Sequence, residues 1–217
     1  MAGSKSDLPP ATCHLLPATR LMNHLQQQTL DHLIAASADN RVTKPGAVAF
    51  GERNRAEARH SSIPGGYQAK STLYGQQSQA SGQFANPGDA QRSSLVARAI
   101  TTDATVTTLF LDGAAERPTL ADNTTWLFRL HVVARRTDAA NESAAYILEG
   151  CIDRQVGVGT TALVGAVAKT VLAEDTAAWD ANVAADAVNG ALQITVTGEA
   201  GKTIRWVAHV ELVEVGA

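Results

Sequence analysis

Cysteine, aromatic residues and surplus positive charge are all scarce in this 217-residue sequence. The two cysteines, Cys13 and Cys151, lie far apart, so the sequence has no disulfide framework and no cysteine-based metal site, and we expect two ordinary thiols. Aromatic residues make up 5% of the chain, so its core must be mainly aliphatic. The formal net charge is −3, whereas a dedicated nucleic-acid surface is normally basic. We therefore expect no nucleic-acid partner.

Long apolar stretches are missing as well. No run approaches the ~18 consecutive apolar residues of a membrane-spanning helix. The first residues, MAGSKSDLPPATCHLL, do not show the charged start and apolar segment that mark a secretory signal. The sequence therefore predicts that the protein does not insert into a membrane. It also predicts that the protein is made in a cytoplasm.

Motifs that carry chemistry are absent too. There is no G-x-S-x-G, G-x-G-x-x-G, P-loop or H-E-x-x-H pattern. His131 and His209 fall in the middle of predicted strands and approach each other if those strands pair, but two histidines without a carboxylate pattern are a weak metal signal. The acidic pairs Glu174–Asp175 and Asp138–Glu142 fall in predicted turns. We therefore expect no catalytic residue, metal or cofactor, and a protein that is not an enzyme.

Residues 1–40 combine a proline-containing leader with a helical pattern. Apolar residues of ATRLMNHLQQQTLDHLIAAS recur near a helical period, although polar residues such as Gln28 interrupt the stripe. Two interpretations are open: a helix that packs on its own domain, and a helix that associates with copies of itself. The residues predicted to serve in anchoring or oligomerisation are Leu21, Leu25, Gln28, His32 and Leu33.

Residues 41–92 are dominated by Gly, Ser, Gln, Asn, Ala and Arg, without a sustained period. Pro-Gly and Gly-Gly pairs mark turns, and the composition is typical of a linker. We expect an extended arm that is ordered by neighbouring subunits, which would satisfy its backbone polar groups.

Residues 93–217 alternate between apolar and polar positions, as half-buried strands do. Eight candidate strands, separated by turn residues and without a helical segment between them, predict a mainly β fold: an antiparallel sandwich of jelly-roll type. The predicted core residues are Trp126, Phe128, Leu130, Val132, Ile204, Trp206 and Val210. The opposite faces carry Leu127, Val133 and Val207, which is more apolar than contact with water requires, and a subunit interface could use them.

Three segments carry a resemblance to a known family. QASGQFANPGDAQRSSLVARAITTDATVTTLFLDG, NTTWLFRLHVVARRTDAANESAAYILEG and ITVTGEAGKTIRWVAHVELVEV resemble the C-terminal β-structured module of fibre and other virion proteins of tailed bacteriophages. The stretch YGQQSQASGQFANPGDAQ is similar in type to the repeats of trimeric adhesin heads, as a single degenerate copy. The resemblance implies a homotrimeric β-structured domain on a phage particle.

The function expected from the sequence is that of a virion structural protein. We predict a short homotrimeric head fibre or capsid decoration (cement) protein, held on the major capsid protein by its N-terminal helix and arm. A neck or tail fibre or an adaptor is one alternative, and a module that binds a receptor or host surface glycan is another. Trp179 is the best sequence candidate for a glycan contact, although a core position is commoner for tryptophan.

Overall fold

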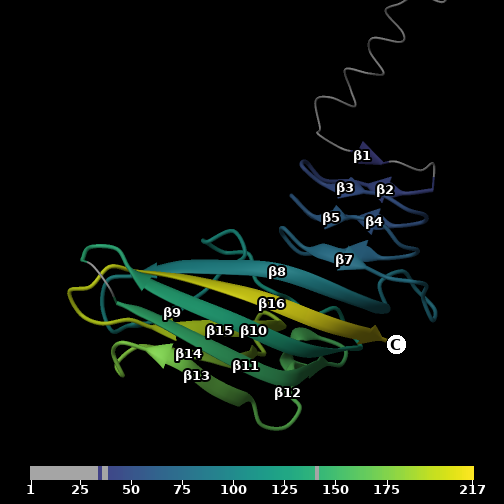
Figure 1. The fold of residues 1–217 in the computed structure, drawn as a ribbon. Helices are drawn as coiled ribbons and strands as arrows, with labels where there is room; N and C mark the ends of the chain where they lie inside the picture. The colour runs from purple at the N-terminus through teal and green to yellow at the C-terminus, as the bar shows by residue number, and fades with distance from the viewer. Residues whose placement is uncertain (1–33, 36–38, 140–141) are drawn as a thin grey trace, which may run out of the picture.

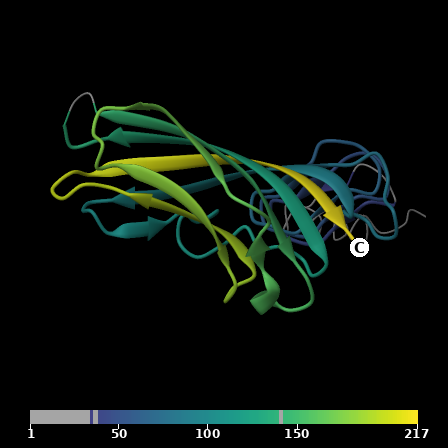
Figure 2. The ribbon, with the colours of Figure 1, turned by 90° about the horizontal axis from the view of Figure 1, so that it is seen from below.

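The computed structural model describes residues 34–35, 39–139 and 142–217. The chain forms two parts, a stack of short parallel strands followed by a β-sandwich (Figure 1). The stack lies at one end of the long sandwich strands, the end where β8 begins and β16 finishes (Figure 2). No helix in the described part of the chain is long and apolar enough to cross a membrane.

The first part, which we call the coil stack, consists of two parallel ladders. Paired residues are 14 or 15 positions apart, as in Val48 with Ser62 and Ser62 with Gln77, so the chain completes one coil in that length. One ladder contains β1 (Ile34–Ala35), β3 (Val48–Ala49), β5 (Ser62–Ile63) and β7 (Gln77–Gln79). The other contains β2 (Arg41–Val42), β4 (Arg55–Ala56) and β6 (Lys70–Ser71).

Small side chains and one asparagine explain why this sequence coils. The buried cluster inside the stack is Ala47, Ala49, Ala56, Ile63, Ala69 and Ala80. Asn54 is fully buried, donates through Nδ2 to the carbonyls of Phe50 and Gly66, and accepts through Oδ1 from the Ala69 amide at 2.8 Å. Gly66 has φ +105°, and a Cβ there would lie 2.4 Å from the Ala80 carbonyl oxygen, so the coils approach too closely for another residue.

The coil stack corrects the prediction of an extended arm over residues 41–92. Its backbone groups are satisfied from coil to coil, for example Val48 N to Ser61 O at 3.0 Å, rather than by partner subunits. The predicted helix lies largely outside the described residues, as do Leu21, Leu25, Gln28, His32 and Leu33. Ile34–Ala35, at the end of that prediction, pair with Val48–Ala49 as strand β1.

The sandwich has one large and one small sheet. Four long antiparallel strands form the large sheet in the order β8 (Ala90–Thr101), β16 (Ile204–Gly216), β10 (Thr124–Arg136) and β11 (Ser143–Arg154). Both β12 (Ala162–Leu163) and β13 (Ala168–Glu174) pair with β11, and a short 3₁₀ turn, η1 (Val158–Thr160), precedes β12. The small sheet has the order β14 (Asp180–Asp186), β15 (Ala191–Thr197) and β9 (Val106–Thr108).

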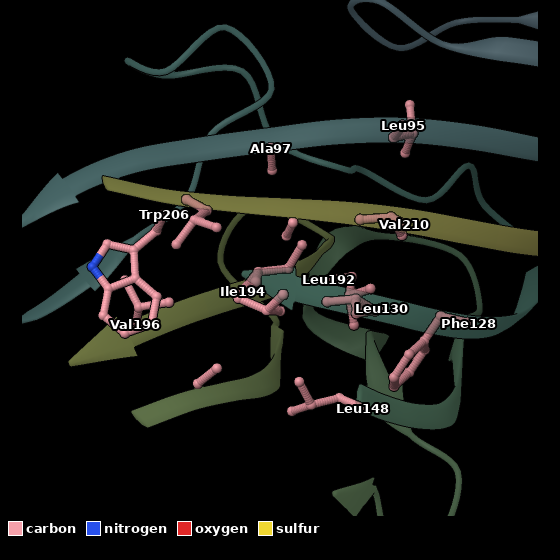
Figure 3. Packing of buried hydrophobic residues seen from close by; sticks show 14 of the residues in the cluster. Leu95, Ala97, Phe128, Leu130, Leu148, Leu192, Ile194, Val196, Trp206 and Val210 are labelled. Atoms are coloured by element: carbon pink, nitrogen blue, oxygen red, sulfur yellow. The ribbon is translucent and has the colours of Figure 1, made fainter. Parts of the chain in front are cut away.

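The core lies between these two sheets. Leu192, Ile194 and Val196 of β15 point towards the large sheet (Figure 3). The seven residues predicted for the core have exposed fractions of 0–2%. Trp179 is also buried, at 1%, and packs against Trp206 with ring centroids 5.9 Å apart, so it is a core residue rather than an exposed glycan contact.

The mainly β prediction is confirmed and its jelly-roll detail is not. Each of the eight candidate segments forms strand, and the fifth divides into β12 and β13. The strands divide into two unequal sheets, whereas a jelly roll places eight strands in two Greek keys. The predicted domain boundary at residue 93 falls inside β8, because β8 begins at Ala90.

A continuous sheet joins the two parts. Strand β7 of the coil stack pairs antiparallel with β8, so that Gln77 lies opposite Ser94 and Gln79 opposite Arg92. Buried hydrogen bonds support this junction: Gln76 Nε2 donates to Ser93 Oγ at 2.8 Å, and Ser78 Oγ lies 3.1 Å from Ser93 Oγ. The described residues thus build one ten-stranded sheet that runs through stack and sandwich.

Candidate functional site

In the described part of the chain, one side of the large sheet is largely exposed. We call it the outer face: the side of β8, β16 and β10 turned away from the small sheet. Seven large aliphatic side chains on it are 44–59% exposed. They are Val96, Ile100, Leu127, Val133, Val207, Val213 and Val215. They alternate along each strand with core residues, as the period of a strand requires. A group of exposed aliphatic side chains on one side of a sheet typically marks an interaction surface.

The strand register arranges the outer face in rows. Val133 lies opposite Val207, and Leu127 lies opposite Val213, so aliphatic pairs form two rows across β10 and β16. Between them, His131 lies opposite His209 and Arg129 opposite Glu211. The outer face therefore combines an apolar surface with a central band that carries both signs of charge.

The polar band makes cross-strand contacts. Arg129 Nε lies 2.9 Å from Glu149 Oε1 of β11, with both side chains about half exposed. Ser94 Oγ of β8 lies 2.8 Å from His209 Nε2. The rings of His209 and His131 stack with centroids 6.1 Å apart, so the two histidines come together as the sequence indicated. No three His, Cys, Asp or Glu residues within the described ranges form a group able to hold a metal ion.

The Ser94–His209 contact resembles a nucleophile beside its base, and we examined whether it has the remaining parts of an acyl-transfer site. Such a site also needs an acid that orients the histidine and N–H groups that stabilise an oxyanion. In the part of the chain that the structure describes, the other neighbour of the His209 ring is His131. Ser94 lies within the β7–β8–β16 ladder, whose backbone amides serve strand pairing. The pair is therefore a cross-strand contact of the outer face.

A groove of ≈ 620 Å³ lies where the coil stack meets the outer face. Pro64 and Gln79 line its stack side, and Leu127, His209 and Glu211 line its sandwich side. Arg92 Nε donates to Gln79 Oε1 at 3.0 Å beside the groove, and the two residues are paired in the β7–β8 ladder, so sheet pairing continues through the junction.

The acidic pairs considered from the sequence have structural partners. Arg136 bonds to Asp138 at 2.8 Å and to Glu142 at 3.2 Å, and Lys202 Nζ lies 2.9 Å from the same Glu142 carboxylate. The hydrogen bond from Arg136 lowers the pKa of Asp138, although burial acts in the opposite direction. These carboxylates hold the β10–β11 and 199–203 loops together.

The other acidic pair stabilises an edge of the large sheet. Tyr146 Oη donates to Glu174 Oε2 at 3.0 Å, and the Ser143 amide donates to Asp175 Oδ2 at 2.7 Å. Both contacts join β11 to the β13 region, so these carboxylates also serve the fold.

Sequence reasoning identified part of the outer face and missed the rest. It named Leu127, Val133 and Val207, but not Val96 and Ile100 on β8. The signal for these residues was present in β8, because the same alternation that places Leu95 and Ala97 in the core places Val96 on the outer face. The predicted core residues lie on β10 and β16, on the side opposite the outer face. The residues predicted for anchoring fall within 1–33, which the structure does not describe.

Comparisons with known proteins find similarity in structure alone. No family model and no curated protein matches the chain. The Acinetobacter baumannii phage AM24 tailspike matches 72% of this chain and 34% of its own, with TM-score 0.33 and 11% identity. Tailspike gp49 of A. baumannii bacteriophage Fri1, named a capsular polysaccharide depolymerase, matches 82% and 34%, with TM-score 0.32 and 8% identity. The Acinetobacter phage vB_ApiP_P1 tailspike matches 79% and 40%, with TM-score 0.25 and 11% identity.

These neighbours correct one prediction. The absence of catalytic motifs led to the expectation that the protein is not an enzyme, but a neighbour in structure is named a depolymerase. That expectation is withdrawn, because carboxylates that cleave a polysaccharide come together in the fold and leave no fixed spacing in the sequence. The chain spans about a third of the length of the tailspikes that it matches, and at these TM-scores the likeness assigns no activity to it.

Proposed function

We propose that the protein is a self-assembling, fibre-type component of a tailed-bacteriophage virion. In this proposal three chains associate through their outer faces. The coil stack forms a short shaft, and the sandwich forms the projecting head. Residues 1–40 attach the trimer to the particle. The observation that carries the proposal is the continuous outer face, with its seven exposed aliphatic side chains.

The physical reason is the cost of leaving this face in water. Burial of an exposed valine or leucine side chain contributes roughly 1.5–3 kcal/mol when it is complete. Seven such residues, each about half exposed, contribute roughly 5–10 kcal/mol per chain when they are covered. This is comparable with the roughly 4–15 kcal/mol that association loses in entropy. Arg129, Glu149 and Glu211 give the same face both signs of charge, so one copy can complement another.

The number of chains is tested by mass in solution. Light scattering on the purified protein should give three times the chain mass of 22.7 kDa. A mass equal to one chain across micromolar concentrations would overturn the proposed assembly, and a dimer would overturn its threefold symmetry.

The place of attachment follows the sequence-based expectation. We propose the head, as a head fibre or capsid decoration protein bound to the major capsid protein, with the neck or tail as the alternative. Gold-labelled antibody against the sandwich, viewed on whole particles by electron microscopy, separates the two. A chain that begins at residue 39 tests the anchor. It removes only β1 from the described stack, keeps the sandwich, and should no longer decorate particles.

A further inference from the structure

A second cavity, of ≈ 210 Å³, lies between the coil stack and the end of the sandwich core. Lys70 and Thr72 line it from the stack, and Trp126 and Glu214 line it from the sandwich. Its volume is several times the ~30 Å³ that one water takes in the liquid. It is smaller than the ~300–1,000 Å³ of pockets for drug-sized ligands. The cavity therefore has room for one small molecule.

Glu214 supplies a buried carboxyl group to this cavity. It lies on the inward side of β16 and is 8% exposed. Gln91 Nε2 donates to its Oε1 at 3.2 Å, and Ser93 and Trp126 are the other polar side chains beside its carboxyl group. Burial raises the pKa of Glu214 to about 7, and the lowering effects of Ser93, Gln91 and Trp126 do not cancel this.

Trp126 supplies an unpaired donor. It lies directly opposite Glu214 in the β10–β16 register, and its side chain is 2% exposed. Its Nε1 is buried without a hydrogen-bond partner in the described part of the chain. The indole is near enough to lower the pKa of Glu214, but the geometry falls short of a hydrogen bond. A buried N–H without an acceptor costs about 1–3 kcal/mol, so an occupant that accepts from it is favoured.

The other charged groups around the cavity already have partners. Asp89 accepts from the amides of Phe84, Ala85 and Asn86 at 2.6–2.8 Å. Asp122 Oδ1 lies 2.7 Å from Arg154 Nη2, and Lys70 Nζ lies 3.8 Å from Glu57. Among the buried groups of the cavity, the one without a partner is Trp126 Nε1, and it lies beside the Glu214 carboxyl group.

An acceptor and a donor on paired residues match the chemistry of a hydroxyl group. An ammonium cannot accept from Trp126, a carboxylate or phosphate is repelled by Glu214 once that group is ionised, and a hydrocarbon leaves Trp126 Nε1 unpaired. We propose that the cavity binds a neutral polyhydroxylated molecule of the size of one sugar residue, with one hydroxyl accepting from Trp126 Nε1 and donating to the Glu214 carboxyl group. This inference does not depend on the proposed assembly or on attachment to a particle.

Saturation-transfer NMR on the full-length protein tests the ligand class. The probes are glucose, galactose and N-acetylglucosamine, with glucosamine and glucuronate as charged counterparts. At least one neutral sugar should bind saturably, and the charged counterparts should bind more weakly. A cavity that exchanges water alone, with no neutral sugar bound, overturns the proposal. Preferred binding of a charged counterpart overturns it as well.

Two variants test the named atoms. Trp126→Phe removes the donor, and Glu214→Met removes the acceptor; each should weaken sugar binding about tenfold. Trp179→Phe is the matched control, because the Trp179 indole donates to Glu199 at 3.3 Å and does not line the cavity. The Trp179→Phe protein should bind the sugar with the same affinity as the unmodified protein. If a folded Trp126→Phe or Glu214→Met protein binds the sugar as tightly as the control does, the site is not the one proposed.

Discussion

His131 and His209 face each other across the β10–β16 pair, with ring centroids 6.1 Å apart and ring planes inclined by 24°. Ser94 contacts His209 from β8, so three neighbouring strands contribute to one polar contact. The aliphatic pairs of Val133 with Val207 and of Leu127 with Val213 lie to either side of it. An assembly that closes over the outer face would bury this histidine pair at its centre.

A lysine on the outer face should break the proposed assembly. Val133→Lys places an ammonium among apolar side chains, where burying it without a partner costs several kcal/mol. We expect the mass measured by light scattering to fall from about three chains to one.

The control for this change is Val188→Lys. Val188 is 83% exposed in the turn between β14 and β15, away from the outer face, and the same substitution there should leave the mass unchanged. If both variants keep the mass of the unmodified protein, the outer face is not the interface.

A cavity made in the sandwich core should lower the free energy of unfolding. Leu130→Ala removes a fully buried side chain, and we expect a loss of about 2–5 kcal/mol in the free energy of unfolding. Leu172→Ala makes the same change at a position that is 60% exposed on β13 and should cost far less. Denaturant unfolding of both variants measures the difference; equal losses would contradict the assigned core.

Asn54 should be the most sensitive polar residue of the coil stack. Asn54→Asp keeps its shape but replaces the Nδ2 donor by an oxygen that faces the carbonyls of Phe50 and Gly66. We expect this buried mismatch to cost about 2–4 kcal/mol and to open the stack locally. Limited proteolysis should then cut between residues 40 and 80 while the sandwich stays intact. Asn189→Asp, in an exposed turn, is the matched control and should resist cleavage there.

The pKa of Glu214 predicts how stability changes with pH. Below pH 4.5, its ordinary pKa, the folded and unfolded chains both hold the proton, and between 4.5 and about 7 the folded chain holds it more tightly. The stabilisation is therefore complete below pH 4.5 and is lost as the pH rises to about 7, a total of about 3 kcal/mol.

Glu214→Gln isolates this contribution. The difference in unfolding free energy between variant and unmodified protein should move by about 2–3 kcal/mol in favour of the variant from pH 5 to pH 8. The same difference at both pH values would show that Glu214 is not the group that titrates.

The sandwich could be predicted from the sequence and the coil stack could not. In TTWLFRLHVVARR the alternation of Trp126 and Phe128 with Leu127 and Arg129 defines a strand with two different faces, and pairing with neighbours only completes it. The stack has strands of two or three residues, too short to show a period of two. Its repeat of 14 or 15 residues is carried by alanines and one asparagine, which also occur in linkers.

The cavity at Glu214 was also beyond sequence reasoning, for a different reason. The alternation along β16 puts Glu214 on the side of Val210 and Leu212, but a glutamate near a strand end is normally solvated, so burial is not expected. Its surroundings arise only when β16 lies between β8 and β10, which places Gln91 and Trp126 opposite the same residue. Three segments far apart in the chain therefore create an environment that none of them carries alone.

The parallel coils end where β7 meets β8 in antiparallel pairing, and this has a consequence for how such a molecule can change in length. The reversal fixes the last coil to the sandwich, but each earlier coil contacts mainly the coil before and after it. A duplication of 14 or 15 residues upstream of β7 can therefore be inserted as a whole, and it lengthens the stack by the spacing of one strand, about 4.8 Å. The length of the stack thus changes in fixed steps of one coil, and it can evolve independently of the sandwich.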